Sequence, residues 1–352
     1  MILEPFRLIS MRLCDRPIHL LPRDTFSQPW PFRLRSWLAT SAGHVTAGFS
    51  LGAWLLWATT GSATAFAEST RVQPPRIFHQ TLAQAQTNPQ TAEGQIALGL
   101  QYIQEGRLSE AIAAFQRATQ LDPQEVAAHY NLGLALRQQG QLQQAANAFY
   151  QAIQVDPSFA VAYANLGAAL LEGSNFQRAE EYLQRAIQLD PSLGLAHYNL
   201  GLVQQYRGQR DAAIASFQQA IALSPNAPEP SYHLGQIYLQ QNLLDNAATA
   251  FQQAIAINPN YPEAQYSLGT ILYQRNDMTG ALEAFRQSAE ANTNYPNAYY
   301  GAGLVFLQQA QYTDAQQVFF YARDLFRAQG NEAWATRSEQ LRQQAIAGLS
   351  NN

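Results

Sequence analysis

Apolar residues recur three and four positions apart through most of the chain, which is the spacing of one face of an α-helix. One such stretch contains Tyr130, Leu132, Leu134 and Leu136, and the next contains Ala145, Phe149, Ala152 and Ile153. Each stretch predicts an amphipathic helix. The two apolar faces are expected to meet, so the pattern predicts a helix–turn–helix unit.

The unit recurs every 34 positions from Ala92 to residue 329, as the step from Gly99 to Gly133 illustrates. A fixed period of this length indicates a stack of small structural units rather than a globular domain. Glycines hold the period at Gly99, Gly133, Gly167, Gly201, Gly235, Gly269 and Gly303. Alanines hold it at Ala111, Ala145, Ala179, Ala213, Ala247, Ala281 and Ala315, and large apolar residues at Phe115, Phe149, Leu183, Phe217, Phe251, Phe285 and Phe319. Seven consecutive units are therefore predicted.

The repeated residues have mechanical reasons for their positions. Gly133 and Ala145 are small, which lets the paired helices approach closely, and Phe149 fills the wider gap on one side. Glycine inside a helix costs about 1 kcal/mol, so close packing must compensate. Asp156-Pro157 is expected to end the second helix, because proline lacks the amide donor and biases its predecessor away from the helical region. Prolines close five units, at Pro123, Pro157, Pro191, Pro225 and Pro259.

These residues at these offsets resemble the tetratricopeptide repeat family. The Asn-Leu-Gly triplets at 131–133, 165–167 and 199–201 are similar to the repeats of protein O-linked N-acetylglucosamine transferases, although no catalytic domain follows. The resemblance implies an all-α, right-handed superhelical solenoid of seven helix–turn–helix units. Thr293 replaces the expected proline and Ala302-Gly303 breaks the Leu-Gly pair, but Tyr295-Pro296 matches Tyr261-Pro262 and keeps the register.

Both ends of the repeat array depart from the pattern. Pro89 lies one full period before Pro123, so residues 77–87 are expected to form a degenerate second helix within a linker and partial repeat spanning 68–91. At the other end, Asn331 to Leu349 predict a polar capping helix within a final segment of 330–352. A cap is needed because the last repeat cannot leave its apolar face bare.

Residues 1–67 lie outside the repeat and predict a targeting segment. Arg33 and Arg35 precede an apolar centre at 45–59, and small residues follow up to Ala67. This order is typical of a secretory signal peptide, so we expect export across a bacterial inner membrane, into the periplasm or an equivalent compartment, with cleavage after Ala67. An uncleaved membrane anchor over residues 45–60 is the alternative, since about 20 apolar residues span a bilayer. The mass of the mature protein distinguishes the two, because cleavage leaves Glu68 as the first residue.

Composition narrows the partner class. All 21 basic residues are arginine, and residues 68–352 hold 15 of them against 22 acidic residues, a formal charge of -7. An acidic body argues against nucleic acid, whose binding requires a basic face. The single cysteine, Cys14, lies in the expected leader, which leaves the repeats without structural disulfides or thiolate metal sites.

Candidate binding residues lie on the first helix of each unit, which the resemblance places on the concave side. Asn131, Asn165, Asn199 and His233 share one position of the repeat, and the resemblance implies an asparagine ladder for peptide backbone over units two to four. One position earlier stand Tyr130, Tyr198, Tyr232, Tyr266 and Tyr300, with Leu134, Leu202, Tyr206, Tyr273 and Leu304 extending the same side. These tyrosines either contact a partner or pack between units, and both readings stay open.

A carboxylate clamp is not expected. Related repeats use lysines and an arginine to grip a chain end, whereas this chain has no lysine and only Arg137 is suitably placed. The chain is also not expected to be an enzyme, to bind a metal or to carry a cofactor. His129 and His197 stand two repeats apart without a ligand set, and no phosphate loop, nucleophile elbow or HExxH motif is present.

The sequence therefore predicts a non-enzymatic, exported scaffold that binds a partner polypeptide in a concave groove. Two alternatives remain. One is a membrane-anchored assembly factor or co-chaperone for a multi-subunit complex, and the other is the targeting arm of a separate enzyme. The identity of the partner does not follow from the repeat.

Overall fold

The computed structural model describes residues 88–350, and these residues divide into two compact blocks. We call residues 88–237 the N-terminal block and residues 238–350 the C-terminal block, and describe each by itself. The targeting segment at 1–67, with the alternative anchor over 45–60, and the degenerate helix at 77–87 lie outside the described residues. Among the described helices, none is both long and apolar enough to cross a membrane.

The described chain is entirely helical, with 15 helices and no strand. The first helices of the seven repeats are α4 (Ala92–Gln104), α6 (Val126–Gln138), α8 (Ala160–Glu172), α10 (Gly194–Tyr206), α12 (Pro228–Gln240), α14 (Pro262–Gln274) and α16 (Pro296–Gln308). The second helices are α5 (Leu108–Leu121), α7 (Leu142–Val155), α9 (Phe176–Leu189), α11 (Arg210–Leu223), α13 (Leu244–Ile257), α15 (Met278–Ala291) and α17 (Tyr312–Ala328). The last helix is α18 (Glu332–Ser350). The solenoid architecture predicted from the repeat period is confirmed.

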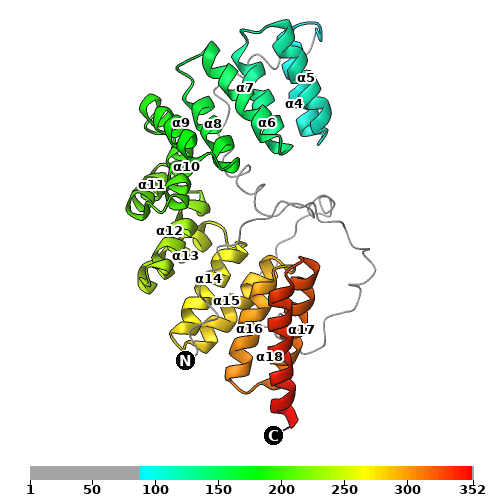
Figure 1. Cartoon of the computed structure of the whole chain (residues 1–352), viewed down its shortest axis with the longest axis vertical. Coiled ribbons are helices and arrows are strands. Elements are labelled where there is room, and N and C mark those ends of the chain that lie inside the picture. The colour runs from blue at the N-terminus through cyan, green and yellow to red at the C-terminus, as the bar shows by residue number, and fades with distance from the viewer. Residues whose placement is uncertain (1–87, 351–352) are drawn as a thin grey trace, which may run out of the picture. The chain divides into compact units, whose positions relative to one another are not determined.

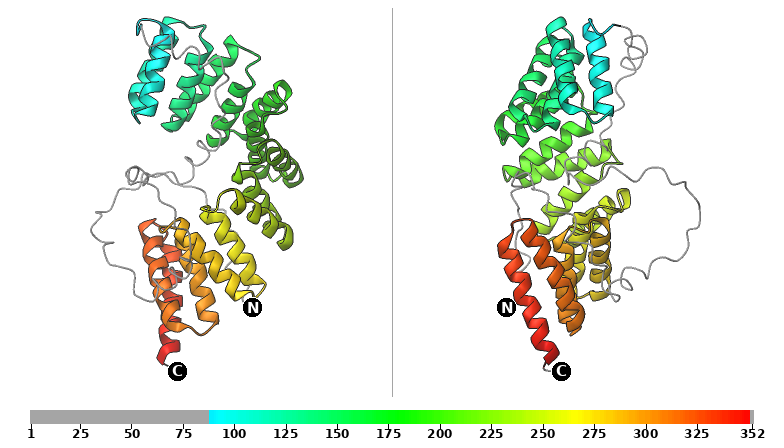
Figure 2. Two further views of the ribbon diagram at one scale, coloured as in Figure 1. Left: turned by 180° about the vertical axis from the view of Figure 1, so that it is seen from behind. Right: turned by 90° about the vertical axis from the view of Figure 1, so that its right-hand side faces the viewer.

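Successive helices form pairs in both blocks, as Figures 1 and 2 show for α4 with α5, α6 with α7 and α16 with α17. The second helix of one repeat then packs on the first helix of the next, as α7 does on α8. First helices also contact one another, α6 with α8 and α8 with α10 in the N-terminal block, and α14 with α16 in the C-terminal block. The first helices thus form the inner side of each stack, which we call the first-helix face.

The repeat glycine and the repeat phenylalanine are one packing unit. A Cβ added to Gly133 would lie 2.6 Å from the Phe149 ring, and one added to Gly201 would lie 2.7 Å from the Phe217 ring. The same contact recurs at Gly99 with Phe115, Gly269 with Phe285 and Gly303 with Phe319, and at Gly167 with Leu183. The phenylalanine ring therefore fills the space that the missing side chain leaves, rather than a separate gap beside it.

The turn between the two helices of a repeat places one residue in the left-handed region. Its φ runs from 56° at Ala310 to 79° at Gly140. This residue recurs once in every repeat, as Gly106, Gly140, Ser174, Gly208, Asn242, Asn276 and Ala310. The conformation ends the first helix, since the amide of Gln141 reaches back to the carbonyl of Leu136 at 2.9 Å.

The second helix ends where the sequence predicted. Helix α7 stops at Val155, and Asp156 caps it in an extended conformation. The Asp156 carboxylate then accepts from the backbone amide of Ser158 at 2.9 Å, which tightens the turn into the next repeat. In the sixth repeat, where Thr293 stands in place of proline, α16 still begins at Pro296.

Helix α18 continues the register as half of a further repeat. Its Trp334 lies one full period after Tyr300, and the two rings meet edge to face at 5.2 Å. Arg337 holds the glycine position. The outward face carries Thr336, Arg337, Gln340, Gln343 and Gln344, all exposed. The predicted polar capping helix is confirmed.

Candidate functional site

Asn165 lies between two first helices and uses both ends of its amide. It is 4% exposed, and its Nδ2 donates to the Val161 carbonyl at 3.0 Å and to the Tyr130 hydroxyl at 3.3 Å. Its Oδ1 accepts from Arg137 Nη1 at 3.3 Å. Because Tyr130 and Arg137 belong to α6 and Asn165 to α8, this network ties the second repeat to the third.

The other two asparagines of the ladder have different surroundings. Asn131 donates to the carbonyl of Ala127, one turn earlier in its own helix, at 2.8 Å. Asn199 is 4% exposed, and its Nδ2 has no hydrogen-bond partner among the described residues. A buried donor without an acceptor costs about 1–3 kcal/mol, so Asn199 is the ladder position where an added acceptor would gain most.

Arg137 is already paired within the protein. Its Nε and Nη2 donate to Glu172 Oε1 at 2.8 and 2.6 Å, in addition to its contact with Asn165. Two other arginines, each just after the end of a first helix, pair with the second helix of the preceding repeat, Arg207 with Glu180 and Arg275 with Asp245. Arg137 would have to leave Glu172 before it could bind a chain-terminal carboxylate.

The tyrosine column packs against the repeat phenylalanines. Ring centroids lie 5.8 Å apart for Tyr130 with Phe149, 6.0 Å for Tyr198 with Phe217, 5.6 Å for Tyr266 with Phe285 and 5.8 Å for Tyr300 with Phe319. The hydroxyl of Tyr232 accepts a hydrogen bond from Gln236 Nε2 at 2.8 Å. Burial raises the pKa of Tyr130 and of Tyr266 to about 12. The column contributes to packing between helices: Tyr198 and Tyr300 are buried, and the other three tyrosines are partly exposed.

His233 takes the ladder position in the fifth repeat and lies among aromatic rings. It stacks on Phe217 at 5.7 Å and 17°, lies 5.8 Å from Tyr198, and pairs through Nδ1 with Gln236 Oε1 at 3.1 Å. Burial disfavours the charged imidazolium and lowers the pKa of His233 to about 4, although the bond to Gln236 opposes this shift. His233 is therefore neutral at pH 7.

The residues that remain available on the first-helix face of the N-terminal block are aromatic, apolar and amide side chains. Tyr206, at the end of α10, is 67% exposed and stacks on Phe176 at 5.3 Å and 13°. Leu134 and Leu202 are partly exposed, and Gln138 is exposed. Tyr206 shares the outward side of its helix with Leu202, and the Phe176 ring restricts its orientation. The sequence placed Tyr206 on this side, but its exposure and its stacking partner follow only from the structure.

The repeated histidines have a structural environment. His129 Nε2 lies 3.0 Å from the Pro123 carbonyl, and His197 Nε2 lies 3.1 Å from the Pro191 carbonyl. With the proton on Nε2, each ring donates to the turn that precedes its helix. Within residues 88–350, no group of three or more His, Cys, Asp or Glu side chains is arranged to hold a metal ion.

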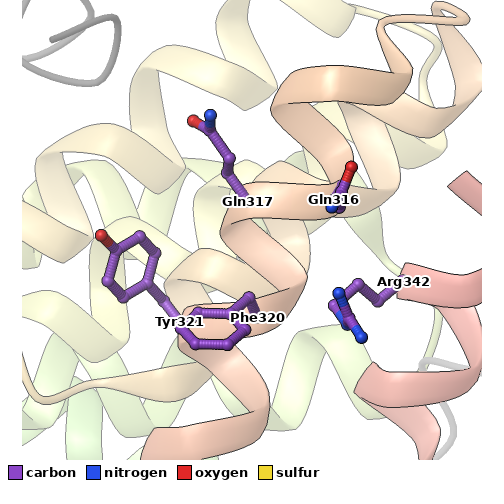
Figure 3. Close-up of a pocket in the computed structure, with 5 residues that line it drawn as sticks. All are labelled: Gln316, Gln317, Phe320, Tyr321 and Arg342. Carbon is purple, nitrogen blue, oxygen red and sulfur yellow. The ribbon is translucent and has the colours of Figure 1, made fainter. Parts of the chain in front are cut away.

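A surface pocket of about 200 Å³ lies outside the first-helix face, where α17 meets α18. Its lining comes from Gln316, Gln317, Phe320 and Tyr321 of α17 and from Arg342 of α18 (Figure 3). None of these residues is among the binding residues predicted from the sequence.

Comparison with known proteins places the repeats in one family. Models described as tetratricopeptide repeat match residues 126–159, 160–193, 198–262, 245–299 and 266–324, and a model described as TPR repeat matches residues 99–137. Together these matches cover more than half of the 352 residues. No curated protein sequence matches the chain.

Solved structures share the fold. The chain is similar to one from the APC/C hetero-tetramer Cut9-Hcn1, with a TM-score of 0.57 and 21% identity, over 65% of this chain and 46% of that one. It thus spans less than half the length of that relative. It is also similar to PilF of Pseudomonas aeruginosa, with a TM-score of 0.53 and 20% identity, over 59% of this chain and 94% of that one. YrrB, described as a TPR protein with an unusual peptide-binding site, has a TM-score of 0.46 and 24% identity over 55% of this chain and 99% of its own.

Proposed function

Because the chain belongs to the tetratricopeptide repeat family, we propose that it is a non-enzymatic scaffold that binds an extended segment of a partner polypeptide along its first-helix face. The resemblance to protein O-linked N-acetylglucosamine transferases suggested the asparagine ladder on this face, although that particular likeness has no support among the comparisons. Export through the leader predicted at residues 1–67 remains part of the proposal, because the order of basic, apolar and small residues favours it.

The observation that carries the proposal is the exposed, stacked ring of Tyr206. A tyrosine gives a large contact area at a low cost in conformational entropy, and it is enriched at protein interfaces for that reason. Stacking on Phe176 restricts the ring before any partner arrives, which reduces the entropy lost on binding.

The chemistry of the face favours an internal, uncharged stretch of polypeptide. Leu134 and Leu202 offer apolar contact, and Gln138 offers amide donors and acceptors. The Arg137 guanidinium is already paired with Glu172, which removes the strongest attraction for an acidic chain end.

The two buried asparagines have different roles in this proposal. Asn165 positions α6 against α8 through Tyr130 and Arg137, whereas the buried Nδ2 of Asn199 becomes available to a partner backbone only if its surroundings rearrange. Replacing Asn131, Asn165 and Asn199 together would therefore mix a loss of binding with a loss of packing. A single replacement at an exposed residue gives a cleaner test.

The test uses the full chain, immobilised and incubated with an extract of the cells that produce it. We expect Tyr206→Ala to lower the amount of the main bound polypeptide at least about tenfold, which corresponds to about 1.4 kcal/mol. The matched control is Tyr150→Ala, which removes another tyrosine, 41% exposed, from the second helix α7. Quantitative mass spectrometry of the eluates gives the result.

Two outcomes would contradict the proposal. Either no polypeptide is enriched over the bare matrix, or Tyr206→Ala retains as much bound polypeptide as Tyr150→Ala. Circular dichroism of both variants should match that of the original chain, because neither side chain is buried.

A further inference from the structure

The second helix of the last repeat carries an aromatic pair where the other repeats are mostly polar. The residue after the repeat phenylalanine or leucine is Gln116, Tyr150, Gln184, Gln218, Gln252, Arg286 and finally Phe320. The residue after that is Arg117, Gln151, Arg185, Gln219, Gln253, Gln287 and finally Tyr321. Packing of the repeat does not require an aromatic residue at either position, since six repeats form their second helix without this pair.

Phe320 is unusually accessible for a phenylalanine. It is 42% exposed, and it lines the pocket of about 200 Å³ together with Tyr321 and, from the capping helix α18, Arg342. Figure 3 shows Arg342 projecting from α18 toward the side of α17 that carries Phe320 and Gln316. The pocket is therefore confined to the end of the C-terminal block, where the capping helix takes the place of a further repeat.

The charges around the pocket are already paired. Arg342 donates through Nε and Nη2 to the two carboxylate oxygens of Glu339, at 2.9 Å each, and Arg323 Nη1 donates to Glu339 at 2.9 Å. These bonds, that of Arg342 first, lower the pKa of Glu339 to about 2, against the opposing effect of its partial burial. Arg323 also contacts Asp324. Two cations thus face two anions, and a charged ligand gains little here.

The geometry offers two flat surfaces instead. The bidentate bond to Glu339 fixes the plane of the Arg342 guanidinium, and a guanidinium plane stacks on aromatic rings. Arg323 lies over the Phe320 ring at 4.4 Å from its centroid, which holds the phenylalanine in place while much of its surface stays exposed. A planar, uncharged side chain can contact both surfaces at once.

We propose that this pocket binds an aromatic side chain of a partner polypeptide against the Phe320 ring and the Arg342 guanidinium, at a site separate from the first-helix face. Gln316 and Gln317 at its rim provide amide groups for the neighbouring backbone of the same partner. The site gives the scaffold a second point of attachment, on the second-helix side. Two linked contacts bind more tightly than either alone, because attachment at one site makes attachment at the other intramolecular.

The test measures binding of N-acetyl-4-fluorophenylalanine amide to the full chain by fluorine NMR, which has no background from the protein. We expect saturable binding, and we expect Phe320→Gln to raise the dissociation constant at least about tenfold. Glutamine occupies this position in four other repeats, so the variant should fold normally. Tyr150→Gln is the matched control, since Tyr150 is an exposed aromatic residue at the same position of the second repeat.

The control variant and the competition experiment decide whether the binding is specific for an aromatic side chain at Phe320. Retention of binding by Tyr150→Gln and weak competition by N-acetyl-leucine amide would support the proposal. Equal loss in both variants, equal competition by the leucine compound, or no saturable binding would overturn it. A concentration-dependent dimer in analytical ultracentrifugation that Phe320→Gln abolishes would also overturn it, because the occupant would then be a second copy of this chain. Tyr206→Ala changes the first-helix face and not the pocket, so it should leave binding of the fluorinated compound unchanged. The proposed function and this second site can therefore be refuted separately.

Discussion

Replacement of Phe149 by alanine is expected to destabilise the N-terminal block by about 3–5 kcal/mol. The Phe149 side chain is 0% exposed, and its ring occupies the space beside Gly133, where even a Cβ would come within 2.6 Å. It also supports Tyr130 at 5.8 Å, and Tyr130 in turn accepts from Asn165 of the next repeat. Removing the ring leaves a cavity that these neighbours fill only in part.

The adjacent residue is the control for this prediction. Tyr150 is 41% exposed on the same helix, and Tyr150→Ala is expected to change the free energy of unfolding by less than about 1 kcal/mol. Urea denaturation followed by circular dichroism gives both values. Because a repeat array can unfold in parts, amide hydrogen exchange should show the loss of protection concentrated in α6 and α7. Equal destabilisation by the two variants would show that the glycine–phenylalanine contact does not organise the repeat.

The second large effect is a loss of stability in acid that depends on His233. Burial lowers the pKa of His233 from 6.5 to about 4 in the folded protein, so the unfolded chain binds the proton more readily. The stabilisation that depends on the neutral ring is fully present above pH 6.5 and is lost as the pH falls toward 4. A shift of this size corresponds to about 3 kcal/mol.

His233→Asn tests this effect, because asparagine occupies the same position in the three preceding repeats and does not titrate. Between pH 7 and pH 4, we expect the original chain to lose about 3 kcal/mol more of its free energy of unfolding than the variant loses. Urea denaturation at several pH values between these limits measures the difference. Parallel pH profiles for the two proteins would contradict a buried, neutral His233.

The sequence predicted the structural features that depend on residues of a single repeat. Gly133, Phe149 and Pro157 repeat at fixed offsets, and both the helix boundaries and the closest contacts follow that period. The glycine contact was predicted as a close approach of two helices, and the structure adds that the phenylalanine ring itself is what requires the glycine.

The sequence did not predict the side-chain contacts between repeats. The partners of Asn165 depend on the distance between α6 and α8, and the repeat period carries no information about that distance. For the same reason, the sequence did not reveal that Asn199 Nδ2 lacks an acceptor while the Asn165 amide has three partners. The sequence did not predict the left-handed turn position for another reason. Gly140, Ser174 and Ala310 share a backbone conformation but no residue type.

Phe320 and Tyr321 could have been found from the sequence by comparing the seven repeats position by position. Their significance still depended on the structure, because an aromatic residue on a second helix is buried or exposed according to what packs beside it. Only the placement of α18 shows that Phe320 remains 42% exposed and lies with Arg342 around one pocket.

The most direct test of the account is photo-crosslinking from single positions on opposite sides of one repeat. A photoreactive amino acid replaces Leu202 on the first-helix face of α10 or, as the comparison, exposed Gln219 on the second helix α11. With the full chain and an extract of the producing cells, we expect a discrete crosslinked polypeptide from position 202 and none from position 219. Equal adducts from both positions, or an adduct from position 219 alone, would contradict binding along the first-helix face.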